Sequence, residues 1–259
     1  MAEHVFVTGA SGAIGGAIAR ELRRRRPAIA LSLVDVTEEP SRDLAVELGG
    51  DAGFVRADLS SSTDAARALD DAIAARGPVS GLVNCAGIME VRRFERIDWA
   101  RADALLAIDL VSPLRLMHAA VPAMIARAAT GDRASFVVNV ASMAGRVTLP
   151  GCAFYGAAKA GLAMASEIAH AELAPRGVHV VTVYPGPVRS ALEARARAQY
   201  ERGLVSRLAP AGDPGVLARK IVDAIDGRRA RVVYPSVYAV GLLAITSPIA
   251  LAVGPAAAD

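Results

Sequence analysis

The stretch TGASGAIGGAIA, residues 8–19, follows a short β-branched run, HVFVT, at residues 4–8. Gly9, Gly12 and Gly15 let the backbone turn sharply and approach a pyrophosphate closely. The helix expected after this turn offers free N–H groups and the positive end of its dipole to an anion. A glycine-rich turn also serves simply to bend a strand into a helix, but its place in the first β–α unit favours nucleotide binding.

Short β-branched runs alternate with alanine-rich segments along the whole chain. The strands predicted from these runs are 4–8, 30–35, 53–58, 79–84, 135–142, 178–184 and 230–234. The helices predicted between them are 13–26, 41–49, 62–76, 98–127, 153–174 and 213–226. Because apolar strands alternate with helices, the pattern predicts the α/β class, as a Rossmann-type doubly wound parallel sheet with helices on both faces. We expect one single domain over 1–259.

Composition narrows the class of protein further. The chain is 53% hydrophobic and 21% charged, which provides a well-filled core. Two cysteines, Cys85 and Cys152, are too few for a disulfide framework and fit a reducing, cytoplasmic compartment. No basic leader precedes an apolar segment at the amino terminus, so no secretory signal is expected. The basic run Arg23 to Arg26 has no interleaved aromatic residues, so we interpret it as a solvated helix end and expect no nucleic-acid partner. No metal site is expected either.

The second predicted strand ends in LVDV, with Asp35 about twenty residues after the glycine turn. A carboxylate there accepts hydrogen bonds from both hydroxyls of an adenosine ribose and repels a 2′-phosphate. No basic residue follows Asp35 closely and Ser11 is neutral, so NAD is predicted as the cofactor in preference to NADP. The alternative is a strand-end carboxylate that only caps the next turn.

The stretch CAFYGAAKAGL, residues 152–162, places Tyr155 one helical turn before Lys159. Residues four apart share a helix face, so the ammonium favours the phenolate and is expected to lower the pKa of the phenol. The phenol then becomes a usable acid or base near neutrality. The alternative is a core tyrosine beside a lysine whose head group reaches water. Ser142, at the end of the fifth predicted strand, favours the chemical interpretation.

Six features in order resemble the short-chain dehydrogenase/reductase family over about residues 4–190. They are TGASGAIG, Asp58 in RADLS, NCAG at 84–87, Ser142, YGAAK at 155–159 and YPGPVRS at 184–190. The resemblance implies a nicotinamide cofactor, a small-molecule alcohol or ketone substrate, and a homodimer or homotetramer. It also implies that Tyr155 gives or takes a proton and that Lys159 lowers the pKa of this tyrosine and holds the nicotinamide ribose. Ser142 would polarise the substrate oxygen.

The resemblance also implies a set of cofactor contacts. The set comprises Gly9, Ser11, Gly12, Ala13, Ile14, Gly15, Asp35, Asp58, Leu59, Asn84, Ala86, Gly87, Tyr155, Lys159, Pro185, Gly186 and Val188. Asp58 would contact the adenine ring, residues 84–87 would line the adenosine ribose, and residues 185–188 would lie against the nicotinamide. Two positions depart from the family pattern: Ala13 replaces a glycine, and Cys85, interpreted as a buried thiol, replaces an asparagine.

A further departure lies within the long helix predicted at 98–127, where Asp109 in LLAIDLVSP matches a family asparagine. The family pattern gives that asparagine the role of stabilising a helix kink, whose backbone carbonyl holds a water near the lysine. Asp109 still accepts hydrogen bonds, but when ionised it adds a negative charge near Lys159. We therefore count Asp109 among the candidate catalytic residues and expect an altered pH optimum. The alternative is a helix carboxylate with no part in catalysis.

The substrate side is predicted from two variable segments. A helical flap at about 187–215 follows the last motif, and an apolar tail runs from about 237 to 253. The tail is too short and too interrupted to predict a membrane span. We expect it to cover the pocket or pack in an oligomer interface, with contact to a membrane surface as the alternative.

Residues around the expected pocket mouth are mostly apolar. Met143, Leu149 and Phe154 suggest a hydrophobic substrate, or simply packing. Arg146 and Arg189 are interpreted as solvated cations rather than as ligands of an anionic substrate.

Together these features predict an NAD-dependent oxidoreductase that interconverts an apolar secondary alcohol and its ketone. The alternative is a catalytically silent NAD-binding sensor or interaction protein on the same fold, which has no need of the serine, tyrosine and lysine set. An epimerase or dehydratase is a third possibility. Those relatives usually carry a longer carboxy-terminal domain, which disfavours them.

Overall fold

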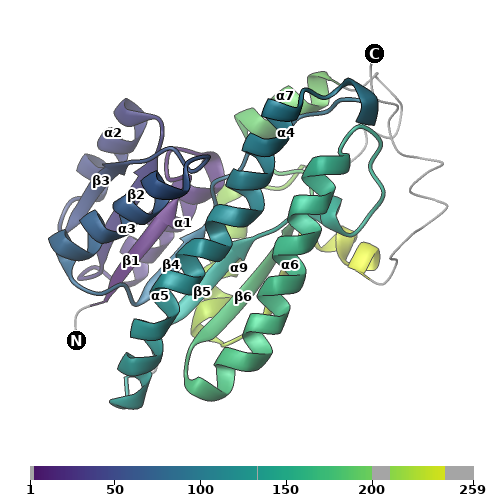
Figure 1. Cartoon of the computed structure of the whole chain (residues 1–259). Helices are drawn as coiled ribbons and strands as arrows, with labels where there is room; N and C mark the ends of the chain where they lie inside the picture. The colour runs from purple at the N-terminus through teal and green to yellow at the C-terminus, as the bar shows by residue number, and fades with distance from the viewer. Residues whose placement is uncertain (1–2, 133, 200–210, 243–259) are drawn as a thin grey trace.

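A computed structural model of the chain describes residues 3–132, 134–199 and 211–242. Its strands are β1 His4–Thr8, β2 Ala30–Asp35, β3 Ala52–Arg56, β4 Gly81–Asn84, β5 Phe136–Val140, β6 His179–Pro185 and β7 Arg231–Tyr234. All seven are parallel and form one sheet in the order β3-β2-β1-β4-β5-β6-β7 (Figure 1). The order reverses between β1 and β4, so the predicted doubly wound sheet is confirmed.

Helices cover both faces of this sheet. They are α1 Ala13–Arg25, α2 Glu38–Leu48, α3 Ser62–Arg76, α4 Trp99–Leu106, α5 Ser112–Ala129, α6 Ala153–Leu173, α7 Ala191–Ala198 and α9 Pro214–Asp226. On one face α1 packs against α9, and Ile18 and Leu217 share a core with the strands. On the other face α3, α5 and α6 cover the sheet through Leu69, Met124 and Leu173 (Figure 1). Burial on both faces explains why the strand sequences are continuously apolar.

Several predicted boundaries differ from the structure, among them the following three. Helix α2 begins at Glu38 rather than at residue 41, because Pro40 is tolerated in a first turn whose N–H groups have no intrahelical partner. Strand β3 ends at Arg56, so Asp58 lies beyond the strand. The helix predicted at 98–127 is divided by a π-helical turn, Ala107–Val111, between α4 and α5.

The helical run Trp99–Ala129 is long and apolar enough, by length and composition, to cross a membrane. In the fold it packs against α3, α6 and the strands, and Leu105, Leu116 and Met124 are buried. These contacts account for its apolar composition as that of a core helix.

The basic run lies at the end of α1 as predicted, but Arg25 and Arg26 are held by ion pairs rather than solvated. Arg25 lies 2.7 Å from a Glu21 oxygen, 2.7 Å from Asp223 and 3.2 Å from Asp226, and its side chain is only 24% exposed. Arg26 also contacts Asp226. These pairs join α1 to α9.

His4 is buried at the start of β1, with Nδ1 2.8 Å from the Gly77 carbonyl oxygen and Nε2 2.9 Å from the Ser32 hydroxyl. Burial lowers the pKa of His4 below its ordinary value of 6.5. As the pH falls, the unfolded chain therefore takes up the proton first. The stability that His4 contributes is complete above about pH 6.5 and is lost as the pH falls towards the folded-state pKa.

We expect His4→Gln to reduce the decline in unfolding free energy between pH 7 and pH 5 by about 1 kcal/mol. Urea denaturation across this range measures the effect. His118→Gln is the matched control, because His118 is exposed on α5 and its replacement should leave the slope unchanged. If the unfolding free energy falls equally with pH in wild type and in His4→Gln, His4 is not the source of this pH dependence.

Candidate active site

The turn between β1 and α1 depends on glycine at points of close backbone approach. Gly9 has a φ of 67°, and a Cβ atom there would lie 2.7 Å from the Ala86 backbone. A Cβ atom on Gly15 would lie 2.2 Å from the Gly9 carbonyl oxygen. Gly12 caps α1, whose first turn has no acidic residue and no side-chain capping hydrogen bond. The positive end of α1 is therefore suited to an anion such as a pyrophosphate.

The loop after β4 is tied to this turn by Thr8. The Thr8 hydroxyl accepts hydrogen bonds from the N–H groups of Cys85 at 3.0 Å and Ala86 at 3.1 Å. These loops flank the point where strand order reverses, which is where doubly wound sheets bind ligands. Thr8 was not among the site residues predicted from the sequence. Its position as the first residue of the TGASGAIG motif was the signal that could have identified it.

Asp35, at the end of β2, lies against the glycine turn. Its carboxylate accepts hydrogen bonds from the N–H groups of Ser11 and Thr37, each at 3.0 Å. The contact with Thr37 corresponds to the capping alternative, whereas the contact with Ser11 brings the carboxylate beside the expected pyrophosphate turn. Ala13 is exposed on this turn and Ile14 packs against the core.

The other residues predicted for the adenosine side differ in burial. Asp58 is exposed beyond β3 and accepts a hydrogen bond from the Ser60 N–H at 2.9 Å. Leu59 is buried in the core, and its carbonyl oxygen accepts the Ser112 hydroxyl at 2.6 Å. Leu59 can therefore offer at most its backbone to a ligand.

Asn84 is buried at the end of β4. Its amide nitrogen donates to the Asn139 side-chain oxygen at 2.8 Å and to the Pro113 carbonyl oxygen at 3.3 Å. Its own side-chain oxygen has no hydrogen-bond partner among the described residues. Asn84 thus joins β4 to β5 and α5 behind the loop that carries Ala86.

The predicted nicotinamide turn follows β6. Pro185 is the last residue of β6, and Gly186 donates its N–H to the Tyr234 carbonyl oxygen at 2.9 Å. A Cβ atom on Gly186 would lie 2.6 Å from the Tyr238 ring, so this position requires glycine. Val188 is buried, and its backbone forms a β-bridge with Gly212, just before α9.

Tyr155 and Lys159 lie on one face of α6, with the Lys159 Nζ atom 5.9 Å from the centre of the Tyr155 ring. Both are buried, at 8% and 4% exposure. The Lys159 Nζ donates a hydrogen bond to the Val140 carbonyl oxygen at 3.0 Å and lies 3.7 Å from an oxygen of Asp109. The lysine head group therefore does not extend to water, and the alternative of a snorkelling lysine fails.

Ser142 caps the short 3-10 turn η3, Met143–Gly145, and its hydroxyl oxygen accepts the Ala144 N–H at 3.1 Å. It lies close enough to Tyr155 for a hydrogen bond from its hydroxyl to favour the phenolate. Burial raises the pKa of Tyr155 above its ordinary value of 10, the Asp109 charge adds to this increase, and the hydrogen bond with Ser142 opposes it. The lowered pKa predicted from the spacing of Tyr155 and Lys159 is therefore not found in the protein alone, because burial outweighs it.

Asp109 lies in the π-helical turn Ala107–Val111 and is fully buried. One carboxylate oxygen accepts the Ile88 N–H at 3.0 Å, and the other has no hydrogen-bond partner among the described residues. Burial raises the pKa of Asp109 to about 6, although the charge of Lys159 opposes the increase. A Cβ atom on Gly87 would lie 2.7 Å from Asp109 and 3.3 Å from the lysine nitrogen, so Gly87 borders the candidate acid–base group.

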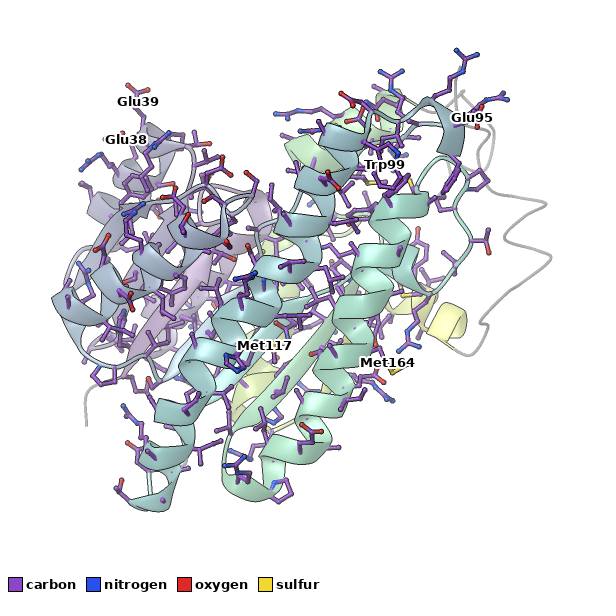
Figure 2. The ribbon with its side chains drawn as sticks, in the orientation of Figure 1. Glu38, Glu39, Glu95, Trp99, Met117 and Met164 are labelled. Carbon is purple, nitrogen blue, oxygen red and sulfur yellow. The ribbon has the colours of Figure 1, made fainter. Side chains whose placement is uncertain are left out.

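Apolar side chains surround Tyr155. Leu149 and Phe154 are half-buried and pack in the same cluster as this tyrosine, whereas Met143 is buried against Tyr184 and belongs to the core. Phe154 also makes a T-shaped contact with Trp99. Trp99 lies at the start of α4 (Figure 2). The cluster comprises Val91, Leu105, Cys152, Tyr155, Ala158 and Ala196, with Ile88, Met89, Leu106, Leu110, Ala144, Leu149 and Phe154 packed against it.

The charged and thiol groups near the site already have partners or are inert. Arg146 contacts Glu167 at 3.0 Å, so its interpretation as a solvated cation was wrong, and Arg189 contacts Asp213 at 2.5 Å. Cys85 is half-buried rather than buried as predicted, but desolvation still raises the pKa of its thiol to about 12. Within the described residues no group of three or more histidines, cysteines or acids is arranged to hold a metal.

The sheet, the glycine turn at the start of α1 and the clustered serine, tyrosine and lysine define a Rossmann-type nucleotide-binding protein. The sequence profile of the family described as "short chain dehydrogenase" matches residues 3–201. The chain is 36% identical over 210 residues to D-threitol dehydrogenase of Mycolicibacterium smegmatis, an alignment that covers 80% of this chain and 78% of that one. The chain belongs to the short-chain dehydrogenase/reductase family of oxidoreductases.

Many solved structures have a similar fold, and two of them serve as examples. A short-chain dehydrogenase from Sphingobium yanoikuyae in complex with NADPH gives a TM-score of 0.77 at 25% identity, covering 90% of this chain and 88% of that one. A short-chain dehydrogenase/reductase from Burkholderia phymatum in complex with NAD gives a TM-score of 0.79 at 21% identity, covering 93% and 92%. One of these two structures therefore contains NADPH and the other contains NAD.

Proposed function

We propose that this chain is an NAD-dependent oxidoreductase that interconverts a secondary alcohol and a ketone, with Tyr155 as the acid–base residue. One observation carries the proposal: a buried phenol lies beside a buried ammonium, on a helix that packs against the turn capped by Ser142. This group lies at the same end of the sheet as the glycine turn. A protein that only senses a nucleotide has no need of such a group, which disfavours the silent alternative.

The chemistry requires two transfers that the chain and its cofactor divide between them. A bound nicotinamide accepts or supplies the hydride at carbon. The alcohol oxygen must lose its proton as the carbon is oxidised, and the Tyr155 phenolate takes it; in reduction the Tyr155 hydroxyl returns it to the ketone oxygen. Ser142 donates a hydrogen bond that orients this oxygen. Lys159, held by the Val140 carbonyl oxygen, provides positive charge that favours the phenolate.

The residues of the turn fit the proposed cofactor. The backbone of residues 9–15 and the start of α1 would hold the pyrophosphate, and residues 185–188 would border the nicotinamide. The Asp35 carboxylate beside Ser11 disfavours a 2′-phosphate and supports NAD over NADP. Arg56 on β3 is paired in register with Asp35 and is exposed.

The apolar surroundings of Tyr155 support an apolar substrate. Met164 and Ile168, exposed on α6 at 53% and 51%, support assembly as a homodimer or homotetramer (Figure 2). Cys85 and Cys152 form no disulfide, which supports a cytoplasmic location. The middle of the flap, 200–210, and most of the apolar tail, 243–253, lie outside the described residues.

Titration with NAD⁺, NADH, NADP⁺ and NADPH, followed by cofactor fluorescence, tests the proposal. We expect the NAD forms to bind more tightly than the NADP forms. Asp35→Ala should raise the Kd of NAD about fivefold, because it removes about 1 kcal/mol of hydrogen bonding to the ribose. Asp43→Ala, an exposed substitution on α2, should leave every Kd within twofold.

The outcomes separate the competing functions. Tight NAD binding leads to a turnover screen with cyclohexanol, 2-octanol and D-threitol. Tighter NADP binding would contradict the assignment of Asp35 and make ketone reduction the direction to measure. Binding of neither cofactor would refute the proposed function.

A further inference from the structure

A second polar cluster lies on α6, two helical turns beyond Lys159. The carboxylate of Glu167 accepts hydrogen bonds from the Tyr184 hydroxyl, from Arg146 at 3.0 Å, and from Arg231 at 3.0 Å and 2.8 Å. The Arg146 guanidinium also donates to the Tyr184 oxygen at 2.7 Å. We call these four residues the Glu167 cluster. None of them belongs to the predicted site.

The cluster joins segments that carry candidate site residues. Arg146 directly follows the η3 turn that Ser142 caps. Tyr184 is fully buried and directly precedes Pro185 on β6. Glu167 lies in the same helix as the candidate acid–base pair. A shift within the cluster would therefore move the serine relative to the tyrosine it contacts.

The η3 turn is seated on the backbone of α6. A Cβ atom on Gly145 would lie 2.6 Å from the Ala160 nitrogen and 2.8 Å from the Lys159 carbonyl carbon. This contact fixes how closely the turn approaches α6, and Met143, buried against Tyr184, holds the apolar side of the turn. The Arg146 guanidinium adds a polar anchor, because it bonds Glu167 and lies 5.1 Å from the centre of the Tyr184 ring.

We propose that Arg146 is a positioning residue, which holds the η3 turn through Glu167 and Tyr184 so that the Ser142 hydroxyl stays beside the Tyr155 phenol. The proposal rests on the proposed function only in that Ser142 and Tyr155 perform the chemistry. Hydrogen bonds between a guanidinium and a carboxylate are stronger and more directional than neutral ones, which suits them to fixing a turn.

The ionisation of the cluster agrees with this role. Burial pulls the pKa of Glu167 upwards, but its hydrogen bonds from Tyr184 and Arg231 and the nearby arginine charges bring it below the ordinary value. Glu167 is therefore a carboxylate at neutral pH. Removing Arg146 leaves this carboxylate bonded to Tyr184 and Arg231, so we expect a folded variant with a locally released turn.

The variant Arg146→Met removes the guanidinium and keeps an apolar side chain. The readout is the ¹³Cζ resonance of Tyr155 in tyrosine-labelled protein, which reports the hydrogen bonding of the phenol. The chain has 5 tyrosines, so Tyr155→Phe assigns the resonance. We expect Arg146→Met to move this resonance in the same direction as Ser142→Ala and by at least half as much.

Arg25→Met is the matched control, because its guanidinium is also bound to carboxylates and its side chain has the same 24% exposure as that of Arg146. It should lower thermal stability without moving the Tyr155 resonance. The proposal is overturned if Arg146→Met leaves the resonance in place, or if Arg25→Met moves it equally. This measurement needs neither cofactor nor substrate.

Turnover provides an independent arm. Arg146→Met should lower kcat about fivefold with the KM for NAD within twofold, which is about 1 kcal/mol at the transition state. In a Ser142→Ala background the same change should have no further effect, because Arg146 acts through Ser142. A full fivefold loss in that background overturns the proposal. If Ser142→Ala itself retains full turnover, the proposed function fails, while the resonance still decides the role of Arg146.

Discussion

Tyr155→Phe is expected to lower kcat about a thousandfold, within the range that general acid–base catalysis contributes. The substitution removes only the hydroxyl. The ring remains in an apolar cluster that already excludes water, so the variant should fold as the wild type does. Without that oxygen, neither direction of the reaction has a group that takes or gives the proton. The measurement is steady-state kcat on whichever alcohol the screen identifies.

Cofactor binding separates this loss from a general disruption of the site. Lys159 keeps its hydrogen bond to the Val140 carbonyl oxygen in the variant, so we expect the Kd of NAD to rise less than tenfold. Tyr234→Phe is the matched control. The hydroxyl of Tyr234, on β7, accepts the Asp213 N–H at 3.0 Å, and the loss of this hydroxyl should change kcat less than twofold. A Tyr155→Phe enzyme with more than a tenth of wild-type kcat would remove this tyrosine from proton transfer.

The sheet could be predicted from the sequence because its signal is local. Each buried strand is a short β-branched run, and each of the first six runs is followed by a helix that crosses back over the sheet. The errors occur where distant contacts decide the outcome. Arg25 was interpreted as solvated because its partners, Asp223 and Asp226, lie on α9 at the other end of the chain.

The candidate site was predictable to the extent that its residues fall within short motifs. Tyr155 and Lys159 are four residues apart, so helix geometry alone brings them together. The Glu167 cluster was missed because Arg146, Glu167 and Tyr184 come from a turn, a helix and a strand with no common motif. The raised pKa of the tyrosine was missed for a related reason: burial depends on the whole fold rather than on the spacing to one lysine.

Asp109→Asn is expected to shift the pH dependence of catalysis towards acid by about one pH unit. Asp109 ionises at a pKa of about 6, and above this value its negative charge raises the pKa of Tyr155. Asparagine can retain the hydrogen bond from the Ile88 N–H but carries no charge. The phenolate should therefore form at lower pH, and alcohol oxidation below its midpoint should become about tenfold faster.

The pH at which the two enzymes differ identifies the cause. Below about pH 6 Asp109 is protonated and neutral, so the rates of wild type and variant should converge there. The pKa of Asp109 is raised on folding, so its ionisation costs stability as the pH rises towards 6, and the variant should be at least as stable as wild type at pH 8. Asp103→Asn, exposed on α4, is the matched control and should leave the profile unchanged. Identical profiles for wild type and Asp109→Asn would remove this residue from the mechanism. If the Asp109→Asn profile shifts towards alkali instead, Asp109 lowers rather than raises the pKa of Tyr155.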